Sequence, residues 1–139
     1  AMMLSSMAVP LLEPTHGAIV FIGSPHTRRA FPGASPYATT KAALEGLTKV
    51  MAAELGPKQI RTGCILPGAV STELNLRAGL FTAEQAKDRY DAVADLHVLG
   101  RIGTGSEVAE GVEYLICAEW VTGVALEIDG GIGLGASHF

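Results

Sequence analysis

The sequence has few of the features that mark secreted, membrane or nucleic-acid-binding proteins. It contains only two cysteines, Cys64 and Cys117, and both lie in apolar runs. That placement predicts buried free thiols in a reducing cytosol, and hence a cytoplasmic protein. No apolar stretch reaches the roughly 18 residues that cross a bilayer, and the short apolar segment 2–12 has no basic leader. We therefore expect no signal peptide and no membrane partner.

Basic clusters and metal-ligand patterns are also missing. The net charge is -4 without any run of Lys or Arg, so nucleic acid is not an expected partner. The four histidines share no ligand spacing with the cysteines, and we predict no metal site. No Gly-x-x-x-x-Gly-Lys phosphate loop, repeat or linker occurs. With 139 residues, 48% hydrophobic and 17% charged, we expect one domain with a substantial core.

Three apolar segments are typical of buried parallel strands. They are 18–23 (AIVFIG), 60–66 (IRTGCIL) and 124–128 (VALEI). Between and around them, the spacing of apolar residues predicts helices at 1–12, 35–55, 83–96 and 107–117. We expect the first helix to end near Pro10, and Ser35 and Ser106 to cap the second and fourth. This order indicates an α/β fold.

Tyr37 and Lys41 lie four residues apart, so the predicted helix places both on one face. A nearby ammonium favours the ionised phenol, which makes Tyr37 a candidate to donate or accept a proton near neutral pH. Alone, the pair also fits an ordinary amphipathic helix. Ser24 follows the first predicted strand, where sites in open α/β sheets form. A serine at the end of a strand is also a common cap.

The second predicted strand ends in a sharp turn, Pro67-Gly68-Ala69-Val70, followed by the hydroxyls of Ser71 and Thr72. Glycine lets a ligand approach the backbone, and proline fixes the turn. An ordinary strand-to-helix turn has the same composition. The long segment 73–105 fits either a binding loop or a surface helix with loose flanks. The pattern Gly131-x-Gly133-x-x-Ala136 is not a dinucleotide loop, because only three residues follow it.

An ordered set of motifs now resembles the C-terminal half of the short-chain dehydrogenase/reductase family. The set is Ser24, Tyr37-x-x-x-Lys41, Pro67-Gly68-x-Val70-x-Thr72, and Thr122-Gly123 before a strand and Asp129-Gly130-Gly131. The resemblance covers almost all 139 residues. It implies the C-terminal half of a Rossmann-like doubly wound parallel sheet, with about three parallel strands and flanking helices.

The resemblance implies an NAD(P)-dependent oxidoreductase that transfers hydride between nicotinamide and a small-molecule carbonyl or alcohol. It assigns Tyr37 as catalytic acid/base, Lys41 as its partner and a ligand of the nicotinamide ribose, and Ser24 as the group that polarises the substrate. The matching residues for the nicotinamide end of NAD or NADP are Tyr37, Lys41, Pro67, Gly68, Val70 and Thr72. Segment 73–99 matches the variable substrate loop, where Leu74, Leu76, Leu80, Phe81 and Tyr90 indicate a partly apolar substrate.

The family's glycine-rich phosphate loop, Asn-Ala-Gly segment and catalytic Asn lie further upstream of Ser24 than this sequence reaches. We therefore interpret 1–139 as a single partial domain without the dinucleotide-binding half, in which strand 18–23 is an unpaired edge. Three explanations stay open: part of a longer enzyme, pairing with another chain, or a truncated non-catalytic module for assembly or binding. The resemblance and the small residues Ala42, Ala43 and Gly46 predict a homo-oligomer. The residues that distinguish NAD from NADP in this family would lie in the half that precedes this sequence.

Overall fold

A parallel sheet of three strands forms the centre of the structure. The computed structural model describes residues 1–73, 77, 79 and 82–136. The strands are β1 (Ala18–Ile22), β2 (Arg61–Pro67) and β5 (Val124–Ile128), in the order β1-β2-β5. All three predicted strands are confirmed to within one residue at each end. β1 pairs on one side only, so it forms an edge of this sheet, as expected.

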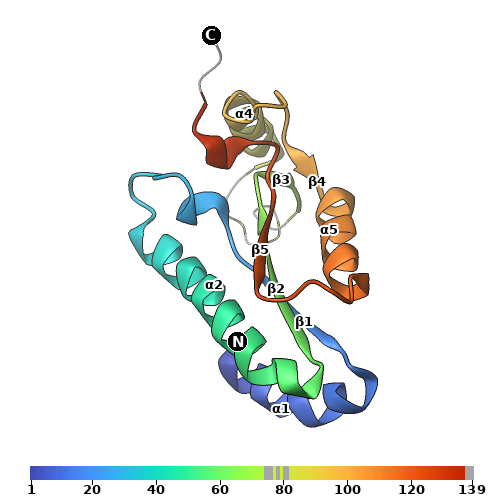
Figure 1. The fold of residues 1–139 in the computed structure, drawn as a ribbon. Coiled ribbons are helices and arrows are strands. Elements are labelled where there is room, and N and C mark those ends of the chain that lie inside the picture. Colours follow the sequence, from blue (N-terminus) through green and yellow to red (C-terminus); the bar gives the residue numbers. More distant parts are fainter. Residues whose placement is uncertain (74–76, 78, 80–81, 137–139) are drawn as a thin grey trace.

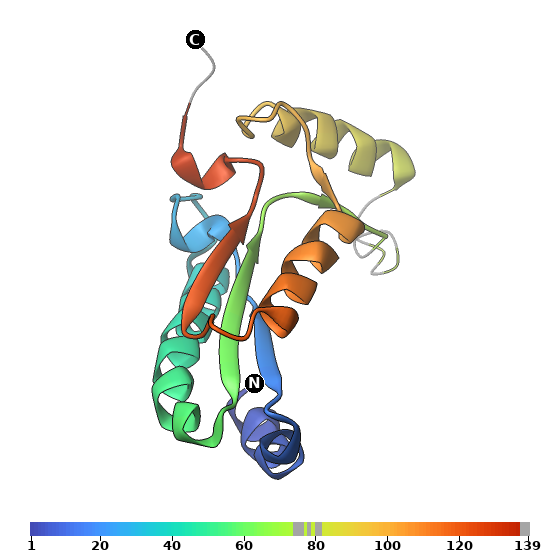
Figure 2. The same cartoon turned by 45° about the vertical axis from the view of Figure 1, so that its right-hand side comes forward.

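Helices cover both faces of the sheet. α2 (Ser35–Leu55) lies on one face and α5 (Gly105–Cys117) on the other (Figures 1 and 2). α1 (Met2–Leu12) lies near the amino ends of the strands, and α4 (Ala83–Ala94) lies beyond their carboxyl ends, beside the short parallel pair β3 (Val70–Ser71) and β4 (Gly103–Thr104). Four 3-10 turns complete the described elements: η1 (Glu13–Thr15), η2 (Pro25–Thr27), η3 (Gly56–Lys58) and η4 (Ile132–Leu134). Within the described residues, none of the helices has the length and apolar content needed to cross a membrane.

The main core lies between α2 and the sheet. Alternate residues of β1 and β2 point to this face, where Phe21, Cys64 and Leu66 pack with Met51 of α2. Cys64 is fully buried, and burial raises the pKa of its thiol. The thiol is therefore protonated and inert near neutral pH, as predicted for a structural cysteine.

Glycines let α5 approach the opposite face closely. A Cβ at Gly63 of β2 would lie 2.8 Å from Leu115 Cδ1, and one at Gly111 of α5 would lie 2.8 Å from Ile128 Cγ1. Leu115 is buried against this face. Cys117, two residues further on, is exposed, so its predicted burial was wrong. The reason is helical phase, since two residues turn a helix by roughly 200°.

Two predicted helix starts are displaced. Ala34 precedes α2 as N-cap, and Ser35 is its first residue. α5 is capped by Thr104 rather than Ser106: the Thr104 hydroxyl accepts the Glu107 N–H at 3.3 Å, and the Glu107 carboxylate accepts the Thr104 N–H at 2.8 Å. This reciprocal capping box satisfies two backbone donors, which a cap at Ser106 would not. α1 continues past Pro10 and ends at Leu12, two residues beyond the predicted end.

Candidate active site

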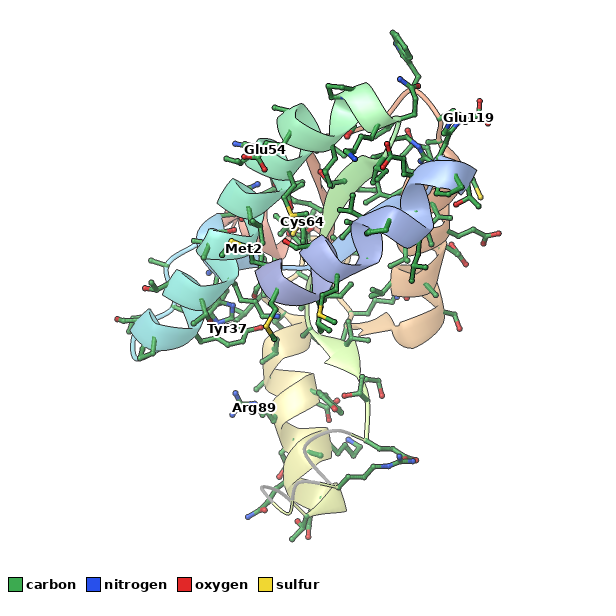
Figure 3. All side chains as sticks on the ribbon, turned by 90° about the horizontal axis from the view of Figure 1, so that it is seen from below. Met2, Tyr37, Glu54, Cys64, Arg89 and Glu119 are labelled. Atoms are coloured by element: carbon green, nitrogen blue, oxygen red, sulfur yellow. The ribbon has the colours of Figure 1, made fainter. Side chains whose placement is uncertain are left out.

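The predicted site residues gather around the carboxyl ends of β1 and β2. Ser24 lies two residues after the end of β1, and Pro67 is the last residue of β2. Tyr37 and Lys41 lie in the first two turns of α2, where Tyr37 projects near the helix start (Figure 3). Parallel strands end at one edge of a sheet, which is why residues so distant in sequence meet there.

Lys41 anchors the start of α2 to the end of β1. Its Nζ donates a hydrogen bond of 2.7 Å to the main-chain oxygen of Ile22, and the same Nζ lies 5.7 Å from the centre of the Tyr37 ring. The shared face predicted for Tyr37 and Lys41 is therefore present. An ammonium has three donors, and Lys41 uses one of them within the part of the chain that the structure describes. Tyr37 is 47% exposed and accessible from solvent.

Ser24 is held in a defined position. Its side chain is buried, and its Oγ lies 2.9 Å from Nδ1 of His26. The same Oγ accepts the backbone N–H of His26 at 3.4 Å, which makes Ser24 the N-cap of η2. The interpretation of Ser24 as a cap is therefore confirmed, and its role in chemistry stays a prediction.

His26 connects Ser24 with Tyr37, and this role was not predicted from the sequence. Its ring meets the Tyr37 ring edge-on at 5.0 Å between centroids, and stacks at 4.3 Å on Phe31. Partial burial lowers the pKa of His26, so its imidazole is neutral near pH 7 and Nδ1 can accept a hydrogen bond from the Ser24 hydroxyl. The sequence signal that could have indicated His26 is its position two residues after Ser24.

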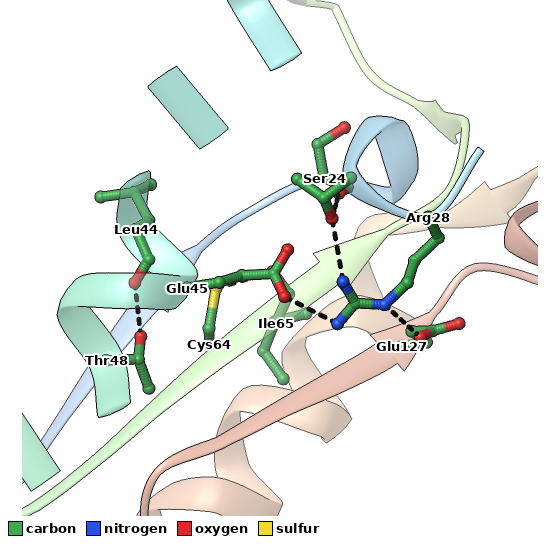
Figure 4. Close-up of polar contacts among 9 residues, drawn as sticks. Ser24, Arg28, Leu44, Glu45, Thr48, Cys64, Ile65 and Glu127 are labelled. Carbon is green, nitrogen blue, oxygen red and sulfur yellow. Dashed lines mark hydrogen bonds and ion pairs between the residues drawn. The ribbon is translucent and has the colours of Figure 1, made fainter. Parts of the chain in front are cut away.

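A charged network holds the loop between β1 and α2. Arg28 Nη2 lies 2.7 Å from Glu45 Oε2 of α2, and Arg28 Nε lies 2.8 Å from Glu127 Oε1 of β5 (Figure 4). Glu45 is largely buried, whereas the Arg28 side chain is about one third exposed. The Arg28 guanidinium therefore links the loop after β1 to α2 and to β5.

The turn after β2 is fixed by main-chain contacts. The Gly68 N–H donates to the Ile128 oxygen at 3.0 Å, and the Ala69 N–H donates to Nε2 of His97 at 3.2 Å. A Cβ at Gly68 would lie 2.7 Å from the main-chain oxygen of Asp129. Gly68 is therefore required for packing against β5, whatever approaches the other side of the turn.

α4 contacts the end of the same turn. The Tyr90 hydroxyl donates to the Thr72 oxygen at 2.9 Å and accepts the Thr72 N–H at 3.3 Å. Tyr90, which lies inside the predicted substrate segment 73–99, thus has a structural partner just outside it. The apolar residues Leu74, Leu76, Leu80 and Phe81 of that prediction lie outside the described residues.

Polar groups at this sheet edge are available to a ligand. Two Lys41 donors are available, and the Thr72 hydroxyl makes no hydrogen bond to any residue that the structure describes. Among the described residues, the Tyr37 hydroxyl forms no hydrogen bond with Ser24 or Lys41. His26 lies between Ser24 and Tyr37, and Lys41 is bonded to the Ile22 oxygen instead. The arrangement supplies a proton donor, a buried hydroxyl and a cation at one sheet edge.

Comparison with known proteins identifies the group to which this architecture belongs. The protein family described as Enoyl-(Acyl carrier protein) reductase matches residues 1–133. A 3-oxoacyl-[acyl-carrier-protein] reductase of Chlamydia muridarum is 34% identical over 130 residues, 92% of this chain and 50% of the relative. Carbonyl reductase family member 4 of Danio rerio is 38% identical over 118 residues, 85% of this chain and 46% of the relative.

Solved structures agree with the sequence matches. An aldohexose dehydrogenase of Thermoplasma acidophilum has a TM-score of 0.86 at 29% identity, covering 97% of this chain and 55% of its own. A small-chain dehydrogenase in complex with NADPH has a TM-score of 0.79 at 29% identity, covering 86% and 52%. The chain spans about half the length of the curated relatives it matches. It belongs to the short-chain dehydrogenase/reductase family of oxidoreductases.

Proposed function

We propose that residues 1–139 carry the catalytic half of an NAD(P)-dependent short-chain oxidoreductase that interconverts a ketone and an alcohol. The observation that carries this proposal is the hydrogen bond from Lys41 to the Ile22 oxygen, which anchors the Tyr37 helix beside Ser24. In this proposal the segment is one partial domain, and the adenosine end of the cofactor is held by residues outside it. Membership of a family of oxidoreductases favours this function over a non-catalytic module.

The proposed chemistry follows from the positions of three side chains. The bound nicotinamide supplies or accepts the hydride. When the carbonyl carbon is reduced, negative charge develops on its oxygen, and Tyr37 donates a proton to that oxygen. Ser24 donates a hydrogen bond to the same oxygen, while the Lys41 ammonium stabilises the phenolate left on Tyr37. In the oxidative direction, Tyr37 accepts the alcohol proton.

The cofactor residues proposed here are Tyr37, Lys41, Pro67, Gly68, Val70 and Thr72. Two N–H donors of Lys41 have no partner among the described residues and can bind ribose hydroxyls, and Thr72 is exposed. Both NAD and NADP fit this end of the site, because they differ only at the adenosine ribose. Solved relatives bind NADPH, so NADPH is the first cofactor to test.

The proposed substrate is a small ketone or its alcohol. Relatives named as 3-oxoacyl-[acyl-carrier-protein] reductases and carbonyl reductases act on carbonyl compounds. A homo-oligomer is also proposed, because α2 exposes the small residues Ala42, Ala43 and Gly46, and α1 exposes Met3 and Leu11. The two free thiols fit a cytoplasmic location.

Cofactor titration of a polypeptide of known length tests the proposal. Intact mass first establishes whether residues precede Ala1. NADPH and NADH are then titrated by fluorescence, and consumption of the bound cofactor is followed with a panel of β-keto thioesters and simple ketones. Binding and turnover of one carbonyl class support the proposed function. Absence of both in the full-length polypeptide overturns it and leaves the non-catalytic module.

A further inference from the structure

His97 is a buried histidine to which the proposed chemistry gives no role. It lies just beyond α4 and is only 1% exposed. Its Nε2 accepts the backbone N–H of Ala69 at 3.2 Å, and its Nδ1 lies 2.9 Å from the main-chain oxygen of Val93. A buried imidazole with partners on both nitrogens is fully satisfied, and its two bonds join separate segments of the chain.

The hydrogen bonds define the protonation of the ring. Because Nε2 accepts a proton from Ala69, it carries none of its own. The Nδ1 must therefore hold the ring proton and donate it to the Val93 oxygen, which lies in the last turn of α4. His97 is thus a neutral imidazole of one tautomer, with an acceptor aimed at the turn and a donor aimed at the helix.

The ring also fills the space between two backbone segments. A Cβ at Gly68 would lie 2.9 Å from His97 Nε2, and one at Gly130 would lie 3.2 Å from His97 Cδ2. Glycines at these two positions allow the turn after β2 and the turn after β5 to close on the imidazole. A side chain of different shape or bonding at position 97 would shift either turn.

We propose that His97 is a positioning residue for the nicotinamide-binding turn, acting through the Ala69 amide. This inference rests on the proposed function, since Ala69 lies within the Pro67–Thr72 segment. His97 holds the start of that segment, and Tyr90 holds its end at Thr72. Both contacts come from α4 and the residues that follow it. The segment expected to contact the substrate therefore holds the backbone of the turn that is proposed to contact the cofactor.

Three substitutions separate this role from simple packing. In His97→Gln, the side-chain oxygen reaches the position of Nε2 and can accept the Ala69 N–H. In His97→Asn, the shorter side chain places its amide near Nδ1, so the bond to Val93 is kept and the acceptor for Ala69 is lost. His97→Leu removes both bonds. The Gln and Asn variants are a matched pair, since each keeps one of the two hydrogen bonds.

The experiment measures two quantities on each variant: amide hydrogen exchange at Ala69, and the dissociation constant for NADPH. Thermal unfolding serves to confirm that the Gln and Asn variants are folded. We expect His97→Gln to bind NADPH within about threefold of wild type, and His97→Asn to bind about tenfold more weakly, because the Ala69 donor is left without a partner. Exchange at Ala69 should rise in the Asn and Leu variants and stay slow in the Gln variant.

Two results would overturn the inference, and they are distinct from failure of the proposed function. If the Asn variant binds NADPH as tightly as the Gln variant, His97 does not position the turn. If Ala69 exchange is unchanged in the Asn and Leu variants, the hydrogen bond has no role in holding it. A wild-type protein that binds neither NADPH nor NADH instead removes the proposed function, and the cofactor role of His97 falls with it.

Discussion

The Lys41 ammonium donates a 2.7 Å hydrogen bond to the main-chain oxygen of Ile22, the last residue of β1. This contact joins the second turn of α2 to the end of β1. Lys41 lies one helical turn after Tyr37, and Ile22 lies two residues before Ser24. The lysine therefore has two roles in the proposed site. It carries a charge beside Tyr37, and it fixes the helix on which Tyr37 stands.

Replacing Lys41 with methionine should remove both roles while keeping the length of the side chain. We expect kcat/KM for ketone reduction to fall by about 100-fold, in the range of lost acid–base assistance. Lys49→Met is the matched control, because Lys49 is an exposed lysine two turns further along α2. Equal activity of the two variants would show that the contact with Ile22 has no catalytic consequence.

His26 should give the reaction a pH dependence on the acidic side of neutrality. Its pKa lies below the usual 6.5 because burial disfavours the imidazolium. Once protonated, its Nδ1 donates to Ser24 Oγ and no longer accepts from it, so the single Ser24 hydroxyl proton is free for the substrate oxygen and ketone reduction should quicken as the pH drops through this pKa. In His26→Gln this pH dependence should disappear. A pH–rate profile with the same dependence in both proteins would assign it to another group.

The same shift predicts the sign of a stability effect. The folded protein binds the His26 proton at lower pH than the unfolded chain does. Stability is therefore fully present above about 6.5, the unfolded pKa, and falls as the pH decreases from there toward the folded pKa. Urea unfolding at a series of pH values, with His26→Gln for comparison, measures this dependence.

Removing Arg28 should destabilise the loop between β1 and α2. Arg28→Met leaves the largely buried Glu45 carboxylate without its cation. We expect a loss of about 1–3 kcal/mol, below the value for fully buried pairs because Arg28 is partly exposed. The double variant Arg28→Met with Glu45→Gln should lose less free energy of unfolding than the two single variants lose together. Lys87→Met at an exposed ion pair is the control and should leave the urea midpoint unchanged.

Glu107 should contribute to stability against acid. Hydrogen bonds from Arg101 first, and then from Thr104, lower the pKa of its carboxyl group to about 2. Its contribution is therefore present above the unfolded pKa of about 4.5 and is lost as the pH falls through about 2. Carbon-detected NMR titration of the Glu107 carboxyl measures this value directly. A midpoint near that of a free glutamate would show that the capping box does not persist in solution.

Much of the fold could be predicted because its signals are local. The apolar runs of β1, β2 and β5 and the four-residue spacing of Tyr37 and Lys41 each lie within one element. Cys117 was misplaced because its apolar neighbours suggested burial, whereas helical phase turns it away from the sheet. The cap at Thr104 was missed because both Thr104 and Ser106 can cap, and only the reciprocal bond with Glu107 distinguishes them.

The connections within the site could not be predicted, because they depend on how separate segments meet. The Ala69 amide and the His97 ring are 28 residues apart, and nothing in either local pattern indicates their hydrogen bond. The contact between His26 and Tyr37 depends on the path of the loop after β1. Family resemblance predicts the candidate residues, whereas the partners of Ser24 and Lys41 follow only from the three-dimensional arrangement of the chain.

Transfer of deuterium from a labelled cofactor tests the central claim most directly. The protein is incubated with NADPH carrying deuterium at the transferable position of the nicotinamide and with a ketone, and the alcohol is analysed by mass spectrometry. Tyr37→Phe is compared with Tyr114→Phe, which alters a tyrosine that is 52% exposed on α5. We expect one deuterium on the carbinol carbon in wild type and Tyr114→Phe, and a rate at least about 100-fold lower in Tyr37→Phe. Unlabelled or absent alcohol in wild type, or full activity of Tyr37→Phe, would contradict the account.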